Sequence, residues 1–149
     1  MKSSKILTGI LAVLGFQSQS CVGTDEYGCP YITYKIKGSV QDANGHKIPD
    51  AEISVKVDGI VERRDSLGVA YKDTISDPVQ TLFSNKKGDF ETTIPYNFES
   101  YLFEIITNKD GYEPDTIHRN AEWKDFSTKK VGEWETLATY NIGITLKKK

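Results

Sequence analysis

Short segments in which apolar and polar residues alternate recur along the chain from residue 33 onward. Successive side chains of a β-strand point to opposite faces, so this period of two predicts strands with one buried face. Stretches rich in Asn, Asp and Gly separate the segments, as is typical of turns. A two-layer all-β sandwich is therefore expected. The predicted strands cover residues 33–41, 51–58, 80–85, 89–94, 101–107 and 140–147.

The pattern also predicts how some strands are placed. The first two strands are joined by the turn 42–45, so we expect them to pair as an antiparallel hairpin. The strand at 101–107 is apolar on both faces, which favours a central, covered position. Two long connections, 59–78 and 113–139, interrupt the pattern. Each either forms a structured loop, where function often lies, or holds an additional edge hairpin.

The N-terminus has the layout of a signal peptide. A basic start with Lys2 and Lys5 precedes an eleven-residue apolar run, Ile6–Phe16, and Cys21 follows shortly afterwards. The run is too short for a transmembrane helix, which needs about 20 residues. A buried N-terminal helix is the alternative, but the run lacks amphipathic spacing. We expect residues 1–20 to be a signal peptide, 21–32 a tether and 33–149 the sandwich domain.

A cysteine directly after the apolar stretch resembles the lipid-attachment box of bacterial lipoproteins, although Gln19 occupies a position where a small residue is usual. The resemblance implies that the Cys21 thiol receives a diacylglycerol and becomes the new, acylated N-terminus. Several acyl chains on one residue give stable anchoring. Asp25 and Glu26 resemble the surface-export signals of Bacteroidetes lipoproteins, or else they belong to a tether that is simply solvated. The expected location is the cell envelope, lipid-anchored at the outer membrane and exposed at the surface.

Two wider resemblances concern the family. The segments 37–45, 48–55, 81–90 and 109–112 are similar to the carboxypeptidase regulatory-like domain, which implies an Ig-like or prealbumin-like antiparallel β-sandwich without catalytic residues. The order of elements, with Tyr27-Gly-Cys-Pro30 and a Lys-rich C-terminus, resembles the radical-SAM-associated lipoproteins of Bacteroidetes. This second resemblance implies a radical SAM enzyme as a partner. Cys29 is then the candidate target of modification, or else an unmodified cysteine that is free or buried. A disulfide between Cys29 and Cys21 is possible only if Cys21 is not lipidated.

No catalytic or metal-binding pattern is evident. His46 and His118 have no spaced ligand partners, so we expect surface histidines, no metal site, no cofactor and no enzymatic activity, with a dispersed-site hydrolase as the weakest alternative. Without residues 1–20 the chain has 17 Lys and Arg against 21 Asp and Glu, a net charge of −4, which argues against nucleic acid as a partner. The candidate ligand-binding residues are aromatic: Trp123, Phe126 and Trp134 could stack against a glycan, or else pack under a loop. The function classes are a non-catalytic anchored module that binds a glycan or an envelope protein, and a substrate of the modifying enzyme.

Overall fold

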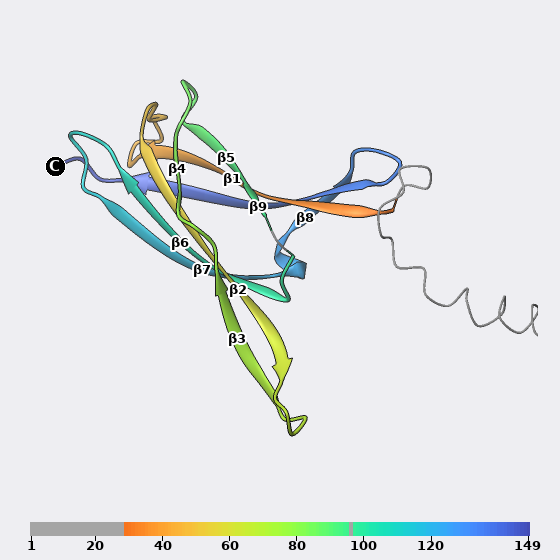
Figure 1. The fold of residues 1–149 in the computed structure, drawn as a ribbon. Coiled ribbons are helices and arrows are strands. Elements are labelled where there is room, and N and C mark those ends of the chain that lie inside the picture. The colour runs from red at the N-terminus through yellow and green to blue at the C-terminus, as the bar shows by residue number, and fades with distance from the viewer. Residues whose placement is uncertain (1–28, 96) are drawn as a thin grey trace, which may run out of the picture. The chain divides into compact units, whose positions relative to one another are not determined.

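The computed structural model describes residues 29–95 and 97–149, and in this part of the chain it confirms an all-β fold of two packed sheets. Residues Tyr31–Lys149 form one compact unit. The expected signal peptide, Cys21 and most of the tether lie outside the described residues. The elements are β1 Tyr31–Asp42, β2 Glu52–Arg64, β3 Ala70–Ser76, β4 Gln80–Phe83, β5 Asp89–Ile94, β6 Ser100–Asn108, β7 Asp115–Glu122, the 3-10 helix η1 Trp123–Asp125, β8 Ser127–Lys130 and β9 Glu135–Leu146 (Figure 1).

The first sheet, sheet A, has the strand order β5-β1-β9-β8, and the second, sheet B, has the order β3-β2-β6-β7 with β4 also paired to β2. β1 and β9 run parallel along twelve residue pairs, from Tyr31 opposite Glu135 to Asp42 opposite Leu146. The other ladders are antiparallel. β6 lies between β2 and β7, which confirms the central position expected for 101–107.

The predicted hairpin between the first two strands is wrong. β5 and β9 occupy both edges of β1, so β2 lies in the opposite sheet. The turn after β1 closes on itself: the Gly45 N–H donates to the Asp42 carbonyl, and Gln41 forms an isolated bridge with Lys47. Gly45 adopts a φ of 82°, which glycine tolerates without strain. Beyond this turn the chain crosses to sheet B. The turn itself was correctly predicted, but the two strands that flank it do not pair with each other.

The predicted inward faces meet in one core. Ile36 and Val40 of β1, Val55 of β2 and Ile144 of β9 have no exposed surface. Burying an aliphatic side chain of this size stabilises a fold by about 1.5–3 kcal/mol. The apolar positions of each alternating segment were therefore correctly assigned, and the space between the two sheets is filled by them.

Both long connections hold strands. β2 continues to Arg64 and β3 returns beside it, forming a hairpin that extends well beyond the other strands of sheet B (Figure 1). This is the edge hairpin that was one of the two alternatives for 59–78. β3 and β4 both pair with β2 and are separated by residues 77–79, which gives a bulge in one long edge. The second connection, 113–139, holds β7, η1 and β8.

In the described ranges no helix is long and apolar enough to cross a membrane.

Candidate functional site

The end of the sandwich where β1 begins is called the tether end here, because the chain from Cys21 joins the domain at this point. β1 and β9 are parallel and so both start at this end, where the Tyr31 N–H donates to the Trp134 carbonyl at 2.8 Å. η1 and the connection from β5 to β6 lie at the same end, since side chains from both line one cavity with β1 residues. The tether end is therefore built from four separate parts of the chain.

Exposed apolar side chains gather at this end. Ten large apolar side chains are exposed in the described part of the chain; five of them belong to the tether end, and three belong to the β2–β3 hairpin, whose tip points away from the start of β1 (Figure 1). Single exposed apolar residues are ordinary, whereas a gathering of them marks an interaction surface. The eight, with their exposed fractions, are Tyr31 54%, Ile32 41%, Leu67 85%, Val69 60%, Tyr71 47%, Trp123 49%, Val131 47% and Trp134 45%.

A cavity of about 240 Å³ opens between the two sheets at this end. Its aromatic walls contact one another: Trp123 packs edge-on against Tyr34, with ring centres 6.0 Å apart, and Phe98 packs edge-on against Tyr101 at 5.7 Å. Tyr34 and Tyr101 are 5.9 Å apart and form the floor. The lining residues are Ile32, Tyr34, Asn97, Phe98, Glu99, Tyr101 and Trp123.

The two floor tyrosines provide the polar groups nearest the core. Burial raises the pKa of the Tyr34 phenol. Burial is also the main reason why the pKa of Tyr101 is raised, and the nearby Tyr34 phenol adds a smaller effect in the same direction. Both phenols therefore stay protonated at neutral pH and present hydroxyl groups. The Phe98 N–H donates to Tyr101 Oη at 3.1 Å, which fixes one wall of the cavity to its floor. An aromatic cavity with few polar groups is typical of a small-ligand site.

The three aromatic residues proposed from the sequence fall into two environments. Trp123 lines the cavity and Trp134 is exposed at the β8–β9 turn. Phe126 is buried, with its ring centre 5.6 Å from Tyr34, and so it lies in the core behind the cavity. Tyr34 and Tyr101, which complete the cavity, were missed because they occupy inward positions of alternating strands, and such positions have the same sequence pattern as ordinary core residues.

The remaining candidate residues lie elsewhere. His46 approaches the Asp42 carboxylate at 3.2 Å and His118 lies 3.7 Å from Glu104; both imidazoles are largely exposed, which confirms surface histidines. No group of three or more His, Cys, Asp or Glu residues that could hold a metal ion occurs in residues 29–95 and 97–149. Cys29 is the first described residue, and its sulfur is not a free thiol.

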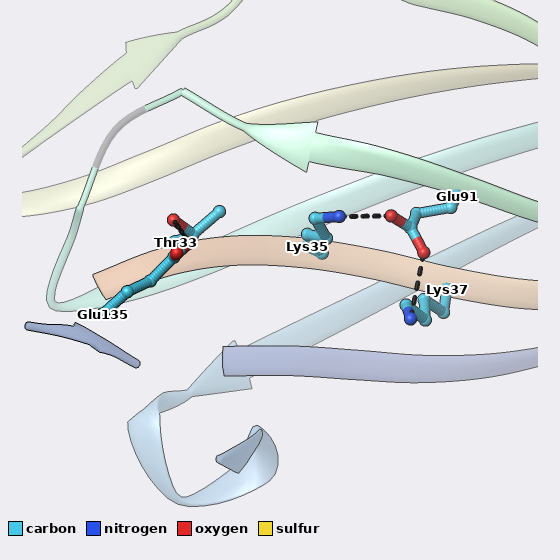
Figure 2. Close-up of polar contacts among 5 residues, drawn as sticks. All are labelled: Thr33, Lys35, Lys37, Glu91 and Glu135. Carbon is cyan, nitrogen blue, oxygen red and sulfur yellow. Dashed lines mark hydrogen bonds and ion pairs between the residues drawn. The ribbon is translucent and has the colours of Figure 1, made fainter. Parts of the chain in front are cut away.

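The outer face of sheet A offers a second, polar surface. Figure 2 shows the Glu91 carboxylate between Lys35 and Lys37, paired with both and 3.0 Å from Lys37 Nζ, while Thr33 Oγ1 donates to Glu135 at 2.9 Å. The hydrogen bonds that the two lysines donate lower the pKa of Glu91, and the bond from Lys35 has the larger effect. A hollow of about 870 Å³ borders this cluster, and it is lined by residues of both sheets, among them the apolar Leu82, Phe90 and Ile142. Exposed ion pairs of this kind contribute little to the stability of the fold. Because Lys35, Lys37 and Glu91 already pair with one another, they leave few charged groups for a ligand.

Comparison with known proteins adds information about the fold. No known protein family and no characterised protein matches this sequence. Hydroxyquinol 1,2-dioxygenase from Pseudomonas putida DLL-E4 has a similar structure, with a TM-score of 0.53 and 10% identity over 94% of this chain and 71% of that chain. 3-Chlorocatechol 1,2-dioxygenase from Rhodococcus opacus 1CP gives a TM-score of 0.44 at 15% identity, over 85% of this chain and 63% of that one.

Catechol 1,2-dioxygenase from Acinetobacter sp. ADP1 gives a TM-score of 0.48 at 10% identity, over 97% of this chain and 68% of that one. This chain therefore spans about two thirds or less of the length of several of these enzymes. At such identities the likeness concerns the fold alone: a β-sandwich that resembles the C-terminal sandwich of the intradiol dioxygenases.

Proposed function

We propose that this chain is an exported lipoprotein of the cell envelope, held at the membrane by a lipid on Cys21, whose sandwich is a non-catalytic module. The observation that carries the proposal is the succession of a basic start, the apolar run Ile6–Phe16 and Cys21. The compact unit begins at Tyr31, ten positions after Cys21, which leaves a short tether between the lipid and the domain.

The family that best fits this layout is the radical-SAM-associated lipoproteins of Bacteroidetes, with a carboxypeptidase regulatory-like sandwich. The two-sheet β-sandwich supports this proposal at the level of the fold. A neighbouring radical SAM enzyme is the proposed partner, and the outer membrane, with exposure at the surface, is the proposed location. Because the Cys29 sulfur has a partner in the structure, modification at Cys29 would require that its thiol first be released.

The test is to compare wild type, Cys21→Ala and Cys29→Ala in a host that processes lipoproteins. We expect wild type and Cys29→Ala to partition into detergent, and Cys21→Ala to be released from membranes or to remain as the precursor. Mass spectrometry of the N-terminal peptide should find the acyl chains on Cys21. A wild-type peptide with no lipid, or with Cys21 joined to Cys29, would reject the proposal, because one sulfur cannot carry both bonds.

Glycan binding is the second candidate function, and the cavity at the tether end favours it. Trp123 stands at its rim as a stacking surface, and the side chains of Asn97 and Glu99 are exposed beside it, where they could hydrogen-bond a sugar. At about 240 Å³ the cavity suits a single ring. Titration of oligosaccharides against wild type and Trp123→Ala tests this: binding that disappears in Trp123→Ala but persists in Trp134→Ala supports it, and the absence of any binding to wild type rejects it.

A further inference from the structure

We propose that the tether end is a membrane-contacting face, which rests on the bilayer with Tyr31, Trp123 and Trp134 at the level of the lipid headgroups. This inference rests on the proposed lipid anchor at Cys21 and deepens it, because it states which face of the domain meets the membrane. The occupant of the exposed apolar surface is then the lipid interface and neither a glycan nor a protein.

The first argument is the reach of the tether. Ten residue steps separate Cys21 from Tyr31, and a fully extended chain of that length spans at most about 35 Å. An anchored domain is thus kept close to the bilayer, and the end that is nearest to the tether is the β1 start. An anchored domain has a high effective concentration at the bilayer surface, so even a weak contact between the domain and the lipids is populated.

The second argument is the one-sided distribution of exposed apolar residues. Of the ten exposed large apolar side chains in the described part of the chain, five lie at the tether end, three lie on the projecting hairpin, and Val79 and Phe83 lie elsewhere. Phe83 pairs with Glu52 at the beginning of β2, which is the opposite end of that strand from the projecting hairpin. Five exposed apolar residues close to one another at the tether end form the kind of gathering that marks an interaction surface.

The third argument is the kind of residue found there. Tyr and Trp have an apolar ring and a polar tip, which suits them to the boundary between headgroups and acyl chains. The chain has two tryptophans, and both are at this end, with 49% of Trp123 and 45% of Trp134 exposed. Ile32 and Val131 lie beside them in the β1 start and the β8–β9 turn and add purely apolar surface.

The charges at this end are of both signs, because the exposed Lys129 and Lys130 of β8 are followed by Glu133 and Glu135, and this distinguishes the contact from an electrostatic one. Lys124 lies 2.8 Å from Glu122 next to η1, and Arg63 lies 2.8 Å from Asp73 in the projecting hairpin. Such pairs leave little net positive charge to attract anionic lipids. The contact should therefore be apolar and aromatic, and salt that screens surface charges should leave it in place.

The experiment uses the full, lipidated chain in phosphatidylcholine vesicles, with and without bromine atoms on the acyl chains near the headgroups. Bromine quenches tryptophan only on contact, so the two native tryptophans report on the tether end. We expect brominated lipid to lower the emission, because tryptophan at the level of the headgroups lies within reach of these bromine atoms, and we expect high salt to leave this quenching unchanged. The matched control moves the reporter to the far end with Trp123→Phe, Trp134→Phe and Phe83→Trp combined, and we expect no quenching there.

The outcomes separate this inference from the anchor on which it rests. Protein that floats with the vesicles but shows equal emission in both lipids would stand clear of the bilayer, and this would overturn the membrane face while leaving the anchor intact. Equal quenching at position 83 would also overturn it, because the domain would have no preferred face. Protein that lacks the lipid and does not float rejects both proposals. Loss of quenching in high salt would overturn the apolar contact in favour of an electrostatic one.

Discussion

Gly38 in the middle of β1 allows a quantitative test of how the core is packed. A methyl group at Gly38 would lie 2.3 Å from Phe90 Cζ and 2.9 Å from Ile142 Cγ2. Carbon atoms pack at about 3.5–4.0 Å, so the Phe90 ring would have to move by about 1 Å in a close-packed interior. Overpacking costs about 1–3 kcal/mol, whereas alanine in place of a strand glycine gains about 0.5–1 kcal/mol. We expect Gly38→Ala to lower the free energy of unfolding by about 1–2 kcal/mol.

Urea unfolding followed by tryptophan fluorescence measures this change. Gly143→Ala is the matched control on the neighbouring strand β9, because a methyl group there meets no atom within 4 Å. In a Phe90→Leu background the ring is gone, and Gly38→Ala should then cost little, giving a coupling energy of about 1–2 kcal/mol between the two positions. Equal stability of Gly38→Ala and Gly143→Ala, or simple addition of the Gly38 and Phe90 costs, would refute the reasoning.

Three further predictions concern buried groups and are checked by urea unfolding at a series of pH values. Val55→Asp should unfold the domain, since an unpaired buried carboxylate costs several kcal/mol, whereas Lys56→Asp on the outer face should be mild; equal effects would contradict the assigned faces. Burial, and then the charge of Asp58, raises the pKa of Asp77, so ionised Asp77 destabilises the fold. Asp77→Asn should stabilise it at pH 7, and this gain should disappear below the ordinary Asp pKa of 3.8, where both forms are neutral. Hydrogen bonds from the backbone lower the pKa of Asp42, so Asp42→Asn should destabilise the fold at pH 7, and the difference should shrink as the pH falls below 3.8; a constant difference would contradict this.

The alternating segments predicted the strands and their inward faces because burial of one face requires a period of two. The same pattern carries no information about partners, and for this reason the expected hairpin between the first two strands was wrong and the parallel β1–β9 pairing was not foreseen. In the candidate site, Trp123 could be identified as an aromatic residue in a long connection. Tyr34 and Tyr101 could not, because a cavity floor and a core position both call for a buried aromatic residue. The burial of Phe126 matches the stated alternative that these aromatic residues pack under a loop, although the sequence did not indicate which of the three would do so.

The pairing of β1 with β9 has a consequence for the timing of folding. Thr33 and Glu135, 102 positions apart in the chain, share a hydrogen bond, and the two strands at the centre of sheet A are the first and the last of the domain. Contacts between such distant parts of a chain form slowly. Sheet A therefore lacks its central partner until the last residues have been synthesised. On the export route proposed above, this topology would keep sheet A open during translocation until β9 has emerged.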